Sequence, residues 1–257
     1  MILTADYHTH TKYSDGKSTI LENALRAKEL GLKEIAITEH GFTHVIWGIR
    51  RREKQKFIRE IEEARKASGM KILVGIEGNI LGRKGTCDLT ESDFADFDVY
   101  VAGMHIIVHY ESLRDFCNGW GAFARYSLGM EGSKRMFKDQ TQAYIHAIER
   151  NPIDIISHLN YECYCDPVEV AKCCRDYGTY LEISGKKPHL TDEELYEVAK
   201  TGVKFVLNSD AHSSDRIADV KIALEQIERV GIPHERIDNV DGRLPNFRLK
   251  EYKERHL

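Results

Sequence analysis

The sequence predicts an α/β fold in which parallel strands alternate with helices. Roughly seven apolar runs of strand length occur along the chain, and segments of helical period separate them. These runs are apolar throughout, as expected of strands that are covered on both faces. The length of 257 residues also fits one α/β barrel. A closed or nearly closed barrel explains the pattern well, and an open doubly wound sheet would give the same local signals.

The expected elements follow one another in a regular order. Thr19 and Glu22 form a capping box that opens the first helix, and Gly31 ends it. The apolar runs predict strands near residues 2–7, 34–38, 71–76, 97–103, 153–157, 179–184 and 203–208. The periodic segments predict helices near residues 20–30, 52–68, 132–150, 167–177, 191–201 and 216–230.

Two segments depart from this alternation. Residues 106–130 contain glycines, aromatic residues and a cysteine without a clear period, and we expect an irregular loop insertion there. Residues 240–257 are expected to form a polar C-terminal tail. The chain as a whole, residues 1–257, is predicted to be a single catalytic domain.

Composition and charge limit the possible functions. The net charge of −4 and the pI near 6.3 give no positive surface for duplex nucleic acid. No apolar run has the length of a membrane span, and no secretory signal is visible, so a cytoplasmic location is expected. The six cysteines contain no C-x-x-C spacing and are interpreted as packing or loop thiols. The oligomeric state has no signature in the sequence.

Residues that can bind metals recur at one position of the predicted units. They lie at or just past the C-terminal ends of the strand-type runs: His8, His10, His40, Glu77, His105, His158, Asp210 and His212. In parallel α/β folds these strand ends converge on one face. Residues two apart on a strand point the same way, so His8 and His10 can chelate one ion. The pattern predicts a polynuclear site for Zn, Mn or Fe.

The remaining histidines lie in loops or helix-type segments. They are His44, His109, His146, His189, His234 and His256. Most are interpreted as solvated or locally hydrogen-bonded side chains. His109 and His189 are placed so that they can approach the pocket from loops.

Seven short motifs occur in a fixed order along the chain. D-x-H-x-H, S-D-G, T-E-H-G, G-I-E-x-N, A-G-x-H, I-S-H and S-D-A-H lie at Asp6–His10, Ser14–Gly16, Thr38–Gly41, Gly75–Asn79, Ala102–His105, Ile156–His158 and Ser209–His212. Together they resemble the PHP family, named for polymerase and histidinol phosphatase, over about residues 3–215. The resemblance implies a distorted (β/α)7 barrel with parallel strands and an active site at their C-terminal ends. It also implies a trinuclear metal centre that hydrolyses phosphoesters.

The resemblance further implies how the ligands are shared among three metals. The first metal would be held by His8, His10, Glu77 and Asp210; the second by Glu77, His105 and His158; the third by Asp15, His40 and His212. Glu77 would bridge the first two metals. The predicted catalytic residues are Glu77, Asp210 and His212.

The expected function is that of a metal-dependent phosphatase for a small phosphomonoester, with two or three divalent transition metal ions (Zn, Mn or Fe). Such ions supply hydroxide at neutral pH and bind phosphate oxygens. The family suggests histidinol phosphate or a nucleotide-type phosphate as the substrate. One alternative is an amidohydrolase or deaminase, but that family places a carboxylated lysine at a strand end, and no strand end here offers one. Another alternative is a non-catalytic PHP-type module.

Basic and aromatic residues on the loop side are candidates for substrate contacts. Lys186 and Arg216 are the main candidates for a phosphate contact, and Lys187 and residues 50–52 lie on the same side. Segment 106–130 directly follows His105, and it is expected to form part of the substrate pocket wall with Trp120 or Arg125.

Overall fold

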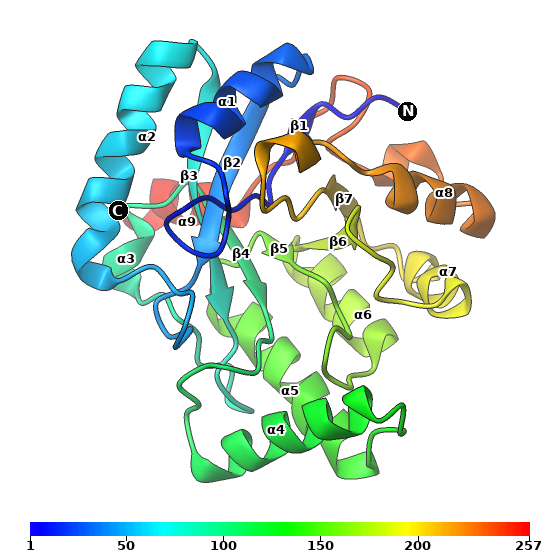
Figure 1. Cartoon of the computed structure of the whole chain (residues 1–257). Coiled ribbons are helices and arrows are strands. Elements are labelled where there is room, and N and C mark those ends of the chain that lie inside the picture. The colour runs from blue at the N-terminus through cyan, green and yellow to red at the C-terminus, as the bar shows by residue number, and fades with distance from the viewer.

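The computed structural model describes all residues of the chain, 1–257, and its helices surround a sheet of seven strands (Figure 1). The strands are β1 (Ala5–Asp6), β2 (Glu34–His40), β3 (Lys71–Asn79), β4 (Val99–Gly103), β5 (Ile155–Ile156), β6 (Tyr180–Ser184) and β7 (Phe205–Asn208). The α-helices are α1 (Ile20–Glu29), α2 (Lys54–Ser68), α3 (Glu91–Phe94), α4 (Leu113–Ser127), α5 (Lys134–Arg150), α6 (Pro167–Tyr177), α7 (Asp192–Lys200), α8 (Lys221–Val230) and α9 (Arg248–His256). Short 3-10 helices are η1 (Arg51–Glu53), η2 (Ser214–Arg216) and η3 (His234–Arg236).

The sheet is parallel throughout, and its strands follow the order of the chain. Each strand pairs with the next one from β1 to β7. The two outer strands are also joined, because Thr9 pairs with Ala211 and the His10 N–H donates to the Ala211 carbonyl at 2.8 Å. The Tyr7 N–H donates to the Asn208 side chain at 3.0 Å. The sheet is therefore a nearly closed barrel, which confirms the expected fold class and excludes the open sheet.

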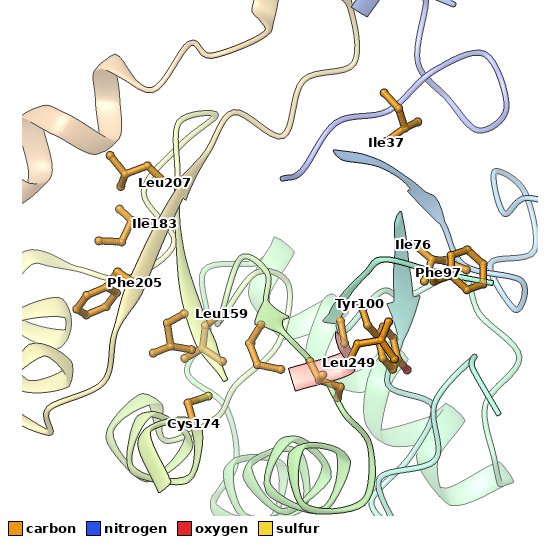
Figure 2. Packing of buried hydrophobic residues seen from close by; sticks show 14 of the residues in the cluster. Ile37, Ile76, Phe97, Tyr100, Leu159, Cys174, Ile183, Phe205, Leu207 and Leu249 are labelled. Atoms are coloured by element: carbon orange, nitrogen blue, oxygen red, sulfur yellow. The ribbon is translucent and has the colours of Figure 1, made fainter. Parts of the chain in front are cut away.

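Apolar side chains pack on both faces of the barrel wall. A cluster of 49 buried residues, part of which Figure 2 shows, includes Tyr100 and lies between the strands and the helices. Val99 and Val101 alternate with Tyr100 along β4 and therefore point into the barrel, where they belong to a second cluster of nine residues. Phe247 joins this inner cluster and contacts Tyr7 edge to face, with ring centroids 5.0 Å apart.

Segment 106–130 is largely helical, which corrects the expectation of an irregular loop. α4 covers fifteen of its residues, and the Ser112 hydroxyl caps the helix by accepting a hydrogen bond from Asp115 N–H. Its period is hard to recognise because Ala122 is the only buried residue of the helix. Gly119 is required where α4 passes Tyr110, since a Cβ there would lie 2.2 Å from the phenol oxygen.

The C-terminal segment also has structure that its polar composition concealed. Residues 248–256 form α9, in which Leu249 is fully buried. Phe247, which directly precedes the helix, packs in the inner cluster of the barrel. The Leu249 N–H donates to the Asp154 carboxylate at 2.9 Å, which ties α9 to the segment that precedes β5. Residues 240–257 are therefore part of the packed structure and not a free tail. No helix of the chain has both the length and the apolar character needed to cross a membrane.

Several elements have other bounds than the sequence predicts; β1, for example, covers only Ala5–Asp6 of the predicted 2–7, and β3 extends to Asn79. β5 contains only two residues, because Ser157 and His158 turn toward the C-terminal face and His158 has a φ of 29°. α8 begins at Lys221 rather than near residue 216, because η2 and a left-handed Ala218 with φ of 60° precede it.

Candidate metal centre

The nine predicted ligands meet at the C-terminal end of the barrel. Each one lies at the end of a strand or in the segment that follows it: His8, His10 and Asp15 after β1, His40 on β2, Glu77 on β3, His105 after β4, His158 after β5, and Asp210 and His212 after β7. The parallel order of the sheet brings these ends together, as the sequence pattern predicted.

Glu77 lies at the middle of this group and is almost fully buried, at 1% exposure. Its Oε1 lies 2.7 Å from His158 Nε2 and 3.4 Å from His105 Nε2. Its Oε2 lies 2.9 Å from His40 Nδ1 and 3.6 Å from His10 Nε2. One carboxylate therefore faces imidazoles from four other strand ends.

Asp210 occupies the position opposite the H-x-H pair. Its Oδ1 lies 3.8 Å from His8 Nε2 and 3.5 Å from His10 Nε2. The two imidazoles thus point the same way, toward one carboxylate oxygen. These three residues form a group whose ligand atoms all lie within 4.8 Å of one another.

Asp15 joins two further histidines on the rim of the site. Its Oδ1 lies 3.5 Å from His40 Nε2, and its Oδ2 lies 3.2 Å from His212 Nε2. With His10 these residues form a second group of ligand atoms within 4.8 Å of one another. A third such group contains His40, Glu77 and His105. The three groups share members, and His158, which belongs to none of them, contacts Glu77, so the nine ligands form one connected cluster.

Buried ligand atoms without partners test whether metal ions fit this cluster. The Nε2 atoms of His8 and His10 are buried and have no hydrogen-bond partner. Buried polar atoms are nearly always paired, so each such atom calls for an explanation. Imidazole nitrogen and carboxylate oxygen are suitable donors for divalent transition metals. The cluster fits metal binding, whereas the six cysteines are all free and belong to none of its groups.

Neighbouring side chains fix the orientation of several ligand imidazoles. His8 Nδ1–H donates to Glu182 Oε1 at 2.8 Å, and His105 Nδ1–H donates to Asn79 Oδ1 at 2.7 Å. His212 Nδ1–H donates to the Asp210 carbonyl at 2.9 Å. In each case Nε2 is left to face the cluster, the arrangement that sets the tautomer of metal-binding histidines. Sequence reasoning missed Glu182, because it lies within an apolar strand and not at its end.

The pKa values of the ligands show which groups are charged in the metal-free protein. Burial would raise the pKa of Glu77, but the His8 and His105 imidazoles hold it well below its usual value. Burial lowers the pKa of His10 to about 3, with help from His40. Burial also acts to lower the pKa of His40, yet the carboxylates of Asp15 and Glu77 raise it to about 10. Glu77 is therefore ionised and His10 neutral at pH 7, the forms that bind cations.

Two of the proposed ligands have a strained backbone. His158 has a φ of 29° and Asp210 a φ of 49°, in the left-handed region that side chains other than glycine rarely adopt. Such conformations cost about 1–3 kcal/mol each and concentrate at functional sites. The strain directs both side chains into the cluster.

A cavity of about 390 Å³ opens above the cluster. Lys186, Lys187 and Trp120 line it, as the sequence suggested, and so do His44 and His189. The position of His44 corrects its interpretation as an ordinary loop histidine, because its ring is buried and stacks on His40.

Other candidates for substrate contacts do not line this cavity. The guanidinium of Arg216 pairs with Asp219, and Arg125 donates to the Glu131 carbonyl. Arg51 pairs with Asp93, and His109 is exposed outside the cavity. The basic side chains at the cavity are therefore Lys186 and Lys187 alone.

Fold and site together place the chain among metal-dependent barrel enzymes. Comparison with known families then gives a more specific assignment. Residues 6–187 match the model of the PHP domain, so the chain belongs to the PHP domain family.

Several known proteins are similar to the chain over most of its length. A probable phosphatase of Thermoanaerobacter sp. is 31% identical over 273 residues, which cover 98% of this chain and 97% of that relative. A probable phosphatase of Vibrio parahaemolyticus is 28% identical, with 92% and 89% covered. The crystal structure of histidinol phosphate phosphatase from Lactococcus lactis, in complex with zinc, L-histidinol and phosphate, superposes with a TM-score of 0.57. That match has 17% sequence identity and covers 91% of this chain and 95% of the other, so it supports the fold.

Proposed function

We propose that this chain is a metal-dependent phosphatase that hydrolyses a small phosphomonoester. The observation that carries the proposal is the connected cluster of histidine and carboxylate ligands, in which the buried Nε2 atoms of His8 and His10 make no hydrogen bond. The curated relatives named above are probable phosphatases. The Lactococcus lactis protein of similar fold was solved with a phosphate ion and zinc.

The cluster would hold two or three divalent ions of Zn, Mn or Fe. The first would be bound by His8, His10, Glu77 and Asp210; the second by Glu77, His105 and His158; the third by Asp15, His40 and His212. When bound, divalent ions polarise phosphate oxygens and lower the pKa of coordinated water toward neutrality.

The protein side chains contribute orientation and charge to this chemistry. Glu77 would bridge two ions and offset the repulsion between them, because its carboxylate is ionised and faces several strand ends. Asp210 and His212 extend from one segment to neighbouring parts of the cluster. Lys186 Nζ lies 3.0 Å from Asp210 Oδ2 and about half of its side chain is exposed, so it can also reach an anionic phosphate in the cavity.

Phosphate release from a panel of monoesters tests the proposed function. The metal-loaded protein is expected to hydrolyse p-nitrophenyl phosphate and at least one of histidinol phosphate or the nucleoside monophosphates. Treatment with a chelator should abolish the activity, and added Zn or Mn should restore it. Absence of phosphate release from every ester, in protein shown to contain metal, would contradict the proposal.

The alternative functions have no comparable support. Amidohydrolase chemistry of the kind considered above needs a lysine at a strand end. Both lysines of this cavity lie in the loop after β6, where Lys186 pairs with Asp210 and Lys187 lies over the Tyr161 ring.

A further inference from the structure

The cavity above the metal cluster is larger than a phosphate group requires. Its volume is about 390 Å³. A phosphate group has five heavy atoms, so most of the space remains for the organic part of a substrate. The chemistry of the walls then determines which organic groups fit.

One wall of the cavity is aromatic. Trp47 stacks on His44 with ring centroids 5.3 Å apart and an interplanar angle of 27°. His44 in turn stacks on His40 at 5.1 Å and 26°. The backbone N–H of Trp47 donates to His44 Nδ1 at 3.2 Å, which orients the His44 ring. This stack runs from a predicted metal ligand to the rim of the cavity, and Trp47 is still 44% exposed at its outer end.

α4 contributes the rest of this wall. Trp120 and Phe123 line the cavity, and their rings meet edge to face with centroids 6.0 Å apart. The segment before α4 is joined to the loop of Trp47, because the Val45 N–H donates to the Ile107 carbonyl at 2.9 Å. Trp120 is 39% exposed despite its size. Exposed apolar area at the mouth of a polar cavity is typical of a ligand-binding groove.

The polar side chains of the cavity include two lysines, which are suited to an anion. Apart from the predicted ligands, they comprise Lys186, Lys187, His44, His189, Tyr161 and Glu162. No serine, threonine, asparagine, glutamine or arginine lines the cavity. Sugar hydroxyls would have to pair with these few side chains once they leave water, because an unpaired buried polar group costs about 1–3 kcal/mol. The aromatic side chains of Trp47, Trp120 and Phe123 match a flat ring.

We propose that the substrate carries an aromatic or heteroaromatic ring, which packs against Trp47 and Trp120 while its phosphate lies at the metal cluster. The inference rests on the proposed phosphatase function for the position of the phosphate. Aromatic pairs gain about 0.5–1.5 kcal/mol beyond their burial, so ring stacking adds selectivity to apolar contact. Trp47 and Trp120 are thus specificity-determining residues.

Tryptophan fluorescence tests the inference without turnover. The chain contains two tryptophans, and both line this cavity, so the emission reports this wall alone. The metal-loaded protein is titrated with benzylphosphonate, cyclohexylmethylphosphonate and methylphosphonate, which share the anion and are not hydrolysed. Benzylphosphonate is expected to change the emission saturably, to bind at least tenfold more tightly than methylphosphonate, and to bind about 2- to 13-fold more tightly than cyclohexylmethylphosphonate. Equal affinity for all three, or for the benzyl and cyclohexylmethyl compounds, would overturn the inference.

Substitutions assign the effect to the two rings. Trp47→Leu and Trp120→Leu each leave one tryptophan as a reporter, and each should reduce the preference for benzylphosphonate over methylphosphonate about tenfold. Tyr126→Leu is the matched control, because Tyr126 lies on the same helix, is 40% exposed and does not line the cavity. An equal loss of preference in this control would show a general effect of α4 and overturn the assignment.

Hydrolysis of benzyl phosphate and ethyl phosphate separates this inference from the proposed function. A preference for benzyl phosphate, expressed mainly in KM, supports both. Tight binding of benzylphosphonate without hydrolysis of any ester would support the ring site and contradict the phosphatase function. Hydrolysis of glucose 6-phosphate in preference to benzyl phosphate would support the function and overturn the ring site.

Discussion

Replacement of Glu77 by glutamine tests the middle of the proposed metal centre. Glutamine keeps the size and shape of the side chain but removes its negative charge. In the structure this charge faces His158 at 2.7 Å and His40 at 2.9 Å, and it is almost fully buried. An amide cannot offset the repulsion of two divalent ions, so we expect Glu77→Gln to lose at least one ion.

The size of the effect distinguishes a bridging ligand from a structural ion pair. Loss of an exposed or capping ion pair would cost about 1 kcal/mol or less and leave turnover nearly intact. Loss of a bridge should lower kcat by at least about a thousandfold, which corresponds to about 4 kcal/mol of transition-state stabilisation. The assay is phosphate release at saturating substrate, together with elemental analysis of the same preparation.

Glu34→Gln is a suitable control for this experiment. Glu34 is a buried glutamate at the N-terminal end of β2, the end away from the ligand His40. There it accepts a hydrogen bond from the Tyr7 hydroxyl at 2.7 Å. Its substitution should change stability but neither metal content nor kcat beyond about twofold. A Glu77→Gln protein with full metal content and turnover within tenfold of the original would refute the bridging role.

Three further predictions concern the support of the site. Glu182→Gln should weaken metal affinity about 10–100-fold, because Glu182 sets the His8 tautomer; unchanged affinity in a competition assay with a metal dye would contradict this. Phe247→Ala should lower the free energy of unfolding by about 3–5 kcal/mol without loss of metal, since Phe247 fills the base of the barrel; urea titration measures this, and a loss below about 1 kcal/mol would be inconsistent with it. His40 has its pKa raised to about 10, so its stabilising contribution to the metal-free protein is fully present below about pH 6.5 and is lost as the pH rises through about 10. Metal-free protein should therefore melt at progressively lower temperature as the pH rises from about 6.5 to about 10. Addition of metal at pH 7 should release protons. Calorimetry in two buffers measures this release, and its absence would refute the assignment of His40 as a metal ligand.

Much of the fold could be predicted because its strands are local features of the sequence. The uninterrupted apolar runs and the capping boxes mark strands and helices, and the polar residues that follow each run mark the C-terminal face. α4 was missed because its apolar residues do not form a buried stripe. Leu113 and Phe116 are exposed, and Gly119 interrupts the apolar pattern. α9 was missed because the C-terminal segment is mostly polar. Only a few apolar residues, among them Phe247 and Leu249, are buried when it packs.

In the candidate site, too, the sequence identified residues that have a local signal and missed those whose role depends on tertiary contacts. His8, His40 and Glu77 were recognisable because each follows or ends an apolar run. Glu182 was not, since a buried glutamate on a strand is given its role only by His8, 174 residues away in the chain. His44 looked like a loop histidine, and its place in the cavity depends on stacking that no spacing rule encodes.

The metal content of the purified protein tests the central claim most directly. Protein prepared without chelators is analysed for Zn, Mn and Fe after removal of loosely bound ions by gel filtration. In the proposed division among three ions, the nine ligands give each ion three to four protein donors, so we expect two or three ions per chain. A content of at most one tightly bound ion per chain would contradict the polynuclear centre on which the proposed function depends.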